Sequence, residues 1–355
     1  MRRRIAAHCR ATTGLKPQDR VPITRSMVRT IVLGAGAAGE RHARAFRALA
    51  DRCLLAGVYD PDPQAARELA MTMSVPALDG LERAFEEAHV AVIAGTVENR
   101  PMLARAALER GLDVLIEPPV ALSSDLAHGL LSAIVRAPRR PIAMVAYDEH
   151  FDPTVCELRA FLADQTIISV HCERMDPAVA GGPTPTLDVV QDLMQRDLQF
   201  VLALTGEPIA ATQAAGRRMR RGGPVDHAQA LLVMEDDLVA GLVASRAGAT
   251  RVRRIRVTTT QGEIAADLDA GTLEAVRTTD VSPGRHEAIA QRIAISAHDP
   301  AVAQAAGFLR YVERRSSPDV GIGMAIACQE ASMAILKRIE LLAHRPALRR
   351  GPTAA

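Results

Sequence analysis

The residues best suited to chemistry in this sequence form a glycine-rich turn of the pattern G-x-G-x-x-G, made by Gly34, Gly36 and Gly39. The first glycine permits a tight turn, the second lets the backbone approach a pyrophosphate, and the third allows a helix to pack closely on a strand. Backbone N–H groups around Ala37 and Ala38 would then face the anion at the start of a helix. The pattern predicts a dinucleotide-binding site.

An acidic residue, Asp60, follows Gly39 by 21 residues, at the end of the next predicted strand, Leu54–Tyr59. A carboxylate at this place accepts hydrogen bonds from the ribose hydroxyl groups of the cofactor. It also repels a 2′-phosphate, and Pro61 and Asp62 add no positive charge beside it. We therefore expect the cofactor to be NAD(H) rather than NADP(H).

The glycine turn lies in a region where short apolar strands alternate with amphipathic helices. This alternation is typical of a parallel sheet that is covered by helices on both faces. We expect an α/β fold with a doubly wound Rossmann sheet in residues 27–148. Its strands are predicted at Thr30–Leu33, Leu54–Tyr59, Val90–Ala94, Val114–Ile116 and Pro141–Tyr147, and helices at Ala38–Ala50 and Pro101–Arg110.

The second half of the chain differs, because strand-like segments follow one another directly. Such a run predicts an α+β domain with a mostly antiparallel sheet in residues 149–345. Residues 235–237 form a predicted hairpin turn, and residues 321–343 a final helix that packs back on the body. The strands are predicted at Ile167–Cys172, Ala228–Met234, Leu238–Ser245, Arg253–Thr259 and Gly262–Leu268.

Composition excludes several function classes. No apolar stretch reaches the roughly 18–20 residues that span a bilayer, so we expect no membrane partner. Only 3% of the 355 residues are aromatic and none is Trp, which leaves little for base stacking. Residues 27–355 hold 36 basic and 40 acidic residues. This near balance gives no bulk attraction for nucleic acid, so we expect no such partner.

The five cysteines are scattered and form no C-x-x-C pair. This favours a reducing compartment and argues against a disulfide framework or a zinc site, so we expect a cytoplasmic protein without a metal. Residues 1–26 contain seven Lys or Arg and one acidic residue. We expect this segment to be a flexible basic extension, and residues 346–355 a tail.

Several segments of the chain resemble the Gfo/Idh/MocA oxidoreductases, the family of glucose–fructose oxidoreductase and inositol dehydrogenase. The resemblance implies a Rossmann domain followed by a domain whose open sheet commonly mediates oligomerisation. We therefore expect a homo-oligomer, either a dimer or a tetramer. The segments are Gly39-Glu40-Arg41-His42 after the phosphate turn, Val90–Thr96, Ala107–Pro119, Tyr147–Pro153 and Asp192–Gly206.

The sequence departs from this family at the residues that move protons. Glu117 and Pro119 match the family's Glu-Lys-Pro, but Pro118 occupies the lysine position. Arg196 occupies the place of the catalytic histidine, and Arg100 replaces a further histidine. Proline has no titratable group, and arginine stays protonated at any working pH. The family's usual dehydrogenation of sugar alcohols, which uses that lysine and histidine, is excluded in that form.

The resemblance assigns roles to the other polar residues. Thr96 and Glu117 are expected to line the ribose–nicotinamide end of the cofactor. Arg196 is expected to orient the substrate, with Tyr147 or His150 as the proton donor. Structural roles remain open for these residues, such as an ion pair between Arg196 and a carboxylate one helical turn away. Further substrate contacts are expected from Arg100, Asp192 and Asp197.

Two functions therefore remain open. In the first, the protein is an NAD(H)-dependent reductase of a C=N or C=O group in a small substrate that can be anionic. Thiazolinyl imine and biliverdin reductases, which are similar to this family, also depart at the lysine position. An iminium or conjugated group is already electrophilic and needs less help from a general acid. In the second, the fold serves a non-redox enzyme, a binding protein or an inactive partner subunit.

Overall fold

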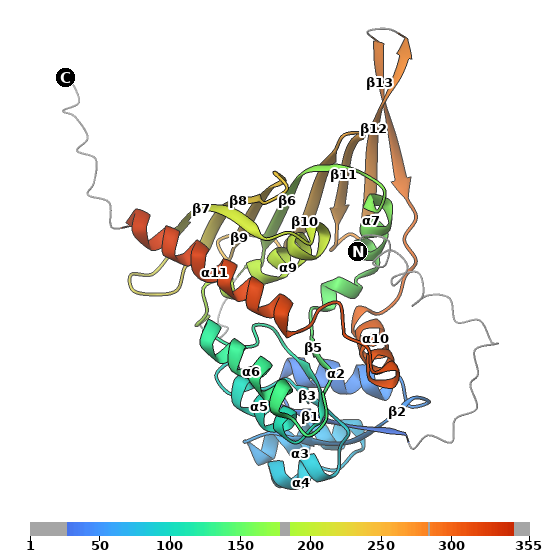
Figure 1. Ribbon diagram of the computed structural model, residues 1–355, viewed down its shortest axis with the longest axis vertical. Coiled ribbons are helices and arrows are strands. Elements are labelled where there is room, and N and C mark those ends of the chain that lie inside the picture. The colour runs from blue at the N-terminus through green and yellow to red at the C-terminus, as the bar shows by residue number, and fades with distance from the viewer. Residues whose placement is uncertain (1–26, 178–184, 283–284, 344–355) are drawn as a thin grey trace.

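The chain folds around two β-sheets, which follow one another in sequence. The computed structural model describes residues 27–177, 185–282 and 285–343, so the extension and the tail expected at 1–26 and 346–355 lie outside the described residues. The smaller sheet lies at the lower end of the molecule and the larger sheet above it (Figure 1). No helix in the described ranges has the length and apolar character needed to cross a membrane.

The first sheet is parallel throughout, as the alternation of strands and helices predicted. Its strands stand in the order β2-β1-β3-β4-β5, so β1 lies between β2 and β3. Every residue of β3 and β4 is buried, because helices cover both faces of the sheet. The strands are β1 (Val28–Leu33), β2 (Cys53–Tyr59), β3 (Val90–Ile93), β4 (Asp113–Ile116) and β5 (Ala143–Val145).

The helices of this half connect the parallel strands. Helices α3 and α4 lie on the side away from the second sheet, whereas α2 faces the second half of the molecule (Figure 1). Asp62 caps the start of α3 by accepting from the Gln64 N–H at 2.9 Å, and Ser123 caps α6 by accepting from the Leu126 N–H. The helices are α2 (Ala37–Arg47), α3 (Pro63–Met73), α4 (Leu81–Glu86), α5 (Arg100–Glu109) and α6 (Ser124–Arg136).

The second sheet has the order β13-β12-β11-β10-β6-β9-β8-β7. All neighbouring strands are antiparallel except β6 and β9, which confirms the predicted mostly antiparallel sheet. Strands β7, β12 and β13 were not predicted. The strands are β6 (Ile167–Met175), β7 (Ile209–Arg217), β8 (His227–Met234), β9 (Val239–Ser245), β10 (Val252–Thr259), β11 (Gly262–Asp267), β12 (Thr272–Ser282) and β13 (Arg285–Ile293).

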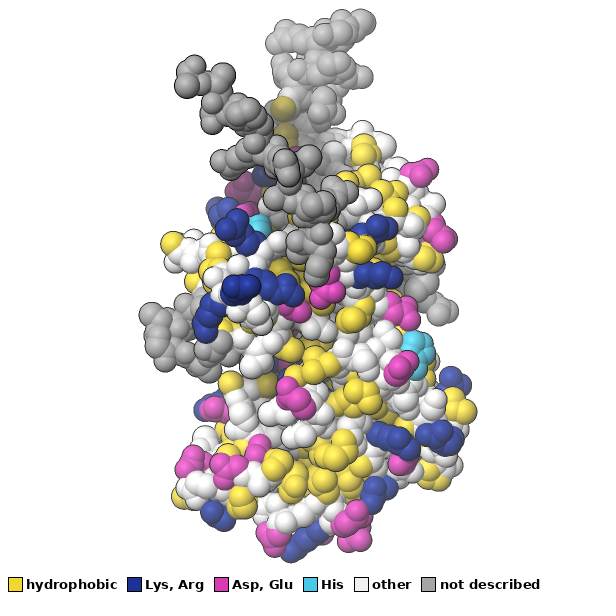
Figure 2. All heavy atoms as spheres, turned by 90° about the vertical axis from the view of Figure 1, so that its left-hand side faces the viewer, with side chains coloured by type: hydrophobic (Ala, Val, Ile, Leu, Met, Phe, Trp, Pro, Cys, Tyr) yellow, Lys and Arg dark blue, Asp and Glu magenta, His cyan; other side chains and the backbone are white. Residues whose placement is uncertain are grey.

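One face of this sheet carries helices and the other is open to solvent. Along β10, Ile255 and Val257 are buried while Arg254 and Arg256 are exposed, which is the alternation of a half-covered strand. Positive and negative side chains are interspersed with apolar ones on the side of the molecule in Figure 2. The elements of this half are η1 (Asp148–Phe151), α7 (Pro153–Leu162), α8 (Val189–Asp192), α9 (Met194–Thr205), α10 (Pro300–Arg314) and α11 (Ile322–Ala343).

The end of the chain returns to the first sheet and ties the two halves together. Helix α10 packs on α2, and α11 packs on α6 as well as on β7. The buried carboxylate of Asp113, at the start of β4, binds the guanidinium of Arg315 at 2.7 Å and that of Arg139 at 3.1 Å. It also accepts the N–H of Ile142 at 2.7 Å. These bonds fix the last two helices against the Rossmann sheet.

Two glycines of the phosphate turn are required by close backbone approach. Gly34 has a φ of 116°, and a Cβ there would lie 2.5 Å from the carbonyl carbon of Ala94 at the end of β3. A Cβ on Gly39 would lie 1.8 Å from the oxygen of Gly34, because α2 begins directly on the turn. Gly36 differs, since a Cβ there would meet no atom within 4 Å.

We expect the substitution Gly39→Ala to lower stability and Gly36→Ala to leave it unchanged. Gly39→Ala forces the turn and α2 apart, and should lower the free energy of unfolding by about 1–3 kcal/mol. Gly36→Ala places its methyl group in open space, where the extended φ of −74° suits any residue, so stability should be unchanged. Urea denaturation of both variants measures this, and equal stability of the two would contradict the close packing.

Candidate functional site

The glycine turn lies at the carboxyl end of β1, where the order of strands reverses. Strand β1 continues to β2 on one side and β3 on the other, and the connections leave toward opposite faces of the sheet. Such a switch point forms a crevice outside the ends of the strands, and this is where open α/β sheets bind ligands. The N–H of Gly34 donates to the carbonyl of Tyr59 at 2.7 Å, which holds the turn against β2.

The carboxylate of Asp60 lies at the base of this turn. One oxygen accepts the N–H of Ala35 at 2.7 Å and the other accepts the N–H of Asp62 at 2.9 Å. These bonds fix the carboxylate beside the turn, while each oxygen keeps a second acceptor position. The half-buried Asp60 therefore stands where the sequence analysis expected an acceptor for ribose hydroxyl groups.

The turn also fits the pyrophosphate of a dinucleotide. Gly36 is the residue before α2, and no side chain caps this helix start. The space in front of Gly36 is open, so a Cβ would project into it without touching the protein. The first N–H groups of a helix lack partners inside the helix and attract anions. Gly34, Gly36, Ala37, Ala38 and Gly39 thus form a cradle that a pyrophosphate fits.

At the end of β4, the carboxylate of Glu117 is held by two side chains of α2. His42 Nε2 lies 2.6 Å and Arg41 Nη2 2.8 Å from the same carboxylate oxygen. Burial alone would raise the pKa of Glu117, but the hydrogen bond and charge of His42 and the charge of Arg41 lower it to about 2. Glu117 is therefore an anion at neutral pH, anchored beside the cofactor cradle.

Thr96 lies in the loop between β3 and α5, and Arg100 is the first residue of α5, on the other side of the switch point. Thr96 is exposed, and its carbonyl accepts the N–H of Arg100 at 3.0 Å. The guanidinium of Arg100 donates to three backbone carbonyls, those of Gly95, Pro118 and Pro119. Arg100 thus joins the loop after β3 to the loop after β4.

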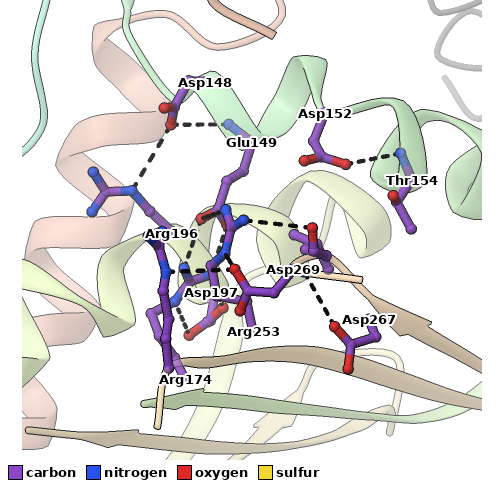
Figure 3. A network of polar contacts seen from close by, with 12 residues as sticks. Asp148, Glu149, Asp152, Thr154, Arg174, Arg196, Asp197, Arg253, Asp267 and Asp269 are labelled. Atoms are coloured by element: carbon purple, nitrogen blue, oxygen red, sulfur yellow. Dashed lines mark hydrogen bonds and ion pairs between the residues drawn. The ribbon is translucent and has the colours of Figure 1, made fainter. Parts of the chain in front are cut away.

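A buried ion network lies behind the crevice, centred on Arg174 of β6 (Figure 3). Arg174 donates to both carboxylate oxygens of Glu149 at 2.6 Å, and to Asp197 of α9 at 2.7 and 3.0 Å. Arg253 lies 3.6 Å from Glu149 and 2.8 Å from Asp269. Burial would raise the pKa of Glu149, but the charge and hydrogen bonds of Arg174 lower it to about 2. Asp197, expected to contact substrate, therefore lies in this network.

Arg196 lies in the first turn of α9 and extends toward Asp148 (Figure 3). Its Nη1 donates to the Asp192 carbonyl at 3.0 Å, and its Nε lies 3.9 Å from the Asp148 carboxylate. Burial would lower the pKa of Arg196, but the charges of Glu149 and Asp148 outweigh this and raise it. The carboxylate of Asp192 does not bind Arg196, because it pairs with Arg246 at 2.7 Å.

The structure brings some of the expected site residues together and separates others. The charge of Arg196 lowers the pKa values of Glu117, Tyr147 and Arg100, so these side chains lie in the same part of the structure, without direct bonds to Arg196 among the described residues. His150 contacts other residues instead, with Arg159 Nη1 at 2.9 Å from its ring and Gln199 Nε2 at 3.4 Å.

The phenol of Tyr147 is fully buried beside the thiol of Cys328. Burial is the main cause that raises the pKa of Tyr147 well above its usual value, so the phenol stays protonated at neutral pH. The role of Tyr147 or His150 as proton donor stays a hypothesis, because both side chains are buried in the structure.

The sequence analysis missed Arg174 as a member of the site. The pattern of β6 held a signal, because Val170, Cys172 and Arg174 alternate on the inward side of the strand and two of them are apolar. An arginine in an inward position requires acidic partners. His42 was noted only as part of the resemblance, and its bond to Glu117 was not foreseen.

Part of the chain is similar to a known protein family. Residues 28–146 match the profile of a family described as "Oxidoreductase family, NAD-binding Rossmann fold". This is the profile of the Gfo/Idh/MocA oxidoreductases, to which residues 28–146 of the chain are similar. The resemblance stated from the sequence is therefore confirmed, and so is the prediction of an NAD-binding Rossmann fold.

Two relatives that the chain is similar to are dehydrogenases. The UDP-N-acetylglucosamine 3-dehydrogenase of Acidithiobacillus ferrooxidans is 28% identical over 232 residues, which cover 65% of this chain and 71% of that protein. The inositol 2-dehydrogenase of Acidothermus cellulolyticus is 28% identical over 233 residues, covering 62% of this chain and 67% of that protein.

Solved structures share the whole fold. The structure of the Acidithiobacillus ferrooxidans enzyme superposes with a TM-score of 0.83 at 23% identity, covering 90% of this chain and 100% of that one. A levoglucosan dehydrogenase in complex with NADH and L-sorbose has a TM-score of 0.78 at 15% identity, covering 88% and 97%. At these identities the likeness concerns the fold alone.

We expect the substitution Arg174→Met to destabilise the protein strongly. It leaves the buried carboxylates of Glu149 and Asp197 without a counter-charge, which costs about 3–5 kcal/mol. Urea denaturation measures the free energy of unfolding. The control is Arg254→Met on the exposed face of β10, which removes only a surface pair with Asp267 and should change little. Equal effects of the two substitutions would contradict the central role of Arg174.

We expect Glu117 to make stability depend on pH in acid. Its pKa is about 2 in the folded protein, below the ordinary value of 4.5, so the unfolded chain binds a proton first as pH falls. The stabilisation is present above pH 4.5 and is lost toward pH 2. Between pH 5 and pH 3, Glu117→Gln should lose about 2 kcal/mol less stability than the unchanged protein.

Urea denaturation at several pH values measures this difference. The control variant Glu86→Gln changes an exposed residue of α4 and should keep the slope of the unchanged protein. The same slope in the Glu117→Gln variant would show that the bonds from His42 and Arg41 do not hold the carboxylate ionised.

Proposed function

We propose that this protein is an NAD(H)-dependent oxidoreductase that reduces a C=N or C=O group in a small, sugar-like substrate. One observation carries the proposal: the open cradle at Gly36 lies beside the fixed carboxylate of Asp60, at the switch point of a parallel sheet. The relatives named above act on a sugar nucleotide and on inositol, which supports a substrate rich in hydroxyl groups.

The residues of the cradle have separate tasks in this proposal. The N–H groups of Ala37 and Ala38 receive the pyrophosphate, and Asp60 accepts from the ribose hydroxyl groups. A negative charge at Asp60 disfavours a 2′-phosphate, so NAD(H) is preferred to NADP(H). Thr96 and Glu117 lie at the other side of the crevice, toward the nicotinamide. When bound, the nicotinamide supplies a hydride to the substrate carbon or accepts one from it.

The charges near Arg196 favour a substrate that needs little acid catalysis. Glu117 is ionised at neutral pH and Arg196 is protonated, so neither of them exchanges a proton during turnover. Arg196 can donate a hydrogen bond to the reacting group and stabilise negative charge there. An iminium group already carries its proton, whereas a carbonyl group requires Tyr147 or His150 to supply one.

A second candidate function follows from the residues at the positions of the family's lysine and histidine. Pro118 and Arg196 replace the family's lysine and histidine, and the side chains of Tyr147 and His150 are buried. A protein of this fold that binds a ligand without hydride transfer, as a non-redox enzyme or a partner subunit, has the same features. The two candidates differ in whether bound NADH is consumed.

We expect NADH to bind the purified protein and to bind more tightly than NADPH. Fluorescence titration measures both affinities, and ligand at about 100 times its dissociation constant should stabilise the protein by about 2.7 kcal/mol. Asp60→Ala and Gly36→Ala should each weaken NADH binding about ten-fold or more. Gly80→Ala is the matched control, because Gly80 also precedes a helix and has open space around it.

Loss of NADH absorbance in the presence of imines and ketones then separates the two candidates. Turnover with any of them supports the reductase, and binding without turnover across the panel supports the non-redox alternative. If neither NADH nor NADPH binds at millimolar concentration, the proposed function is wrong and the glycine turn serves packing alone.

A further inference from the structure

Among the residues that the structure describes, Arg100 has no anionic partner. Its Nε donates to the Gly95 carbonyl at 3.0 Å, and its Nη1 donates to the carbonyls of Pro118 and Pro119 at 3.0 and 3.2 Å. No carboxylate of the described ranges lies within ion-pair distance of this guanidinium, and its Nη2 has no hydrogen-bond partner there. Three hydrogen bonds to backbone carbonyls thus fix the guanidinium of Arg100, and its Nη2 amino group stays available.

Burying the guanidinium of Arg100 without a bound anion costs free energy. Removal from water lowers the pKa of Arg100, and the repulsion by Arg196 acts in the same direction. Glu117 and Glu98 oppose this from a distance but do not contact the guanidinium. A partly buried cation of this kind is stabilised by an anion that binds its free amino group.

Arg196 supplies a second cation to the same region from the other half of the chain. Its Nη1 is bound to the Asp192 carbonyl, and its Nε only approaches the Asp148 carboxylate, at 3.9 Å. Its Nη2 has no hydrogen-bond partner among the residues that the structure describes. The Arg196 side chain is 24% exposed, so part of it reaches solvent. Figure 3 shows the guanidinium extending beyond the Arg174 network.

We propose that Arg100 and Arg196 together bind an oxyanion of the substrate, a carboxylate or a phosphate. Each guanidinium offers one terminal amino group, and an oxyanion between them would relieve their mutual repulsion. The Arg196 backbone lies on α9, in the half of the chain that has no phosphate turn. The cofactor's pyrophosphate has its own cradle at Gly36, so we assign this second anion to the substrate. This inference rests on the proposed function and narrows its substrate to an anionic one.

The test uses small probes and the full chain saturated with NADH. Acetate and inorganic phosphate represent the two oxyanions, and acetamide is the uncharged analogue of acetate. Titration followed by ligand-observed NMR gives each dissociation constant. We expect acetate or phosphate to bind at least about ten-fold more tightly than acetamide, because bonds from charged donors are stronger than those from neutral ones.

The variants Arg196→Gln and Arg100→Gln should each weaken oxyanion binding about ten-fold or more. Arg100→Gln also removes bonds to two loops, so its fold is checked by thermal melting. Arg196→Gln loses one hydrogen bond, to the Asp192 carbonyl at the end of α8, and the 3.9 Å approach to Asp148. Among the described residues it joins no loops of the Rossmann half, so it keeps the test decisive if the Arg100→Gln variant is unstable. The control Arg256→Gln changes an exposed arginine of β10, paired with Glu263 on the open face, and should bind like the unchanged protein.

Three results would overturn the assignment. The first is equal binding of acetate, phosphate and acetamide, and the second is unchanged oxyanion binding in the Arg196→Gln variant. The third is a loss of NADH affinity in both arginine variants, which would make the cofactor's pyrophosphate the bound anion. If NADH fails to bind while phosphate binds in an arginine-dependent way, the proposed function fails and the oxyanion site stands.

Discussion

The buried guanidinium of Arg174 is the interaction on which the geometry of the crevice depends. It joins β6 of the second sheet to Glu149, which follows the last strand of the first sheet, and to Asp197 on α9. Because the two carboxylates and the guanidinium are all desolvated, none of them is satisfied without the others. The network therefore sets how α9 lies against the Rossmann half, and with it the place where Arg196 enters the crevice.

The crevice has two sides with different chemistry. The cofactor side consists of backbone N–H groups, small residues and the anchored carboxylates of Asp60 and Glu117. The proposed substrate side carries the cations Arg100 and Arg196, where the resemblance to the family implies a histidine at each place, and a proline at the position that it implies for the lysine. Proline and arginine do not donate a proton at working pH. The reacting group of the substrate must therefore need little help from a general acid. Under the proposed function, such a site favours a substrate that is already electrophilic and carries a negative charge.

Prediction from sequence succeeded for segments whose role is local. The parallel strands of the first sheet, the turn at Glu235-Asp236-Asp237 and the last helix lie where apolar periodicity and turn residues indicated. Strand β7 was missed because its sequence is rich in alanine, and β12 and β13 because their polar residues give no clear alternation. These three strands form because they pair with neighbours that already have a covered face.

The sequence by itself determined the glycine turn, the place of Asp60 after the second strand and the fold class. Each of these depends on residue types within one short segment, or on a backbone conformation that only glycine allows. Tertiary structure decided which charges pair. Arg41 donates to Glu117, which lies 76 residues further along the chain. Arg174 donates to Asp197, 23 residues away, and Arg100 donates to the Pro118 carbonyl, 18 residues away. Charged side chains reach many partners in an unfolded chain, and only packing selects which ones are desolvated together.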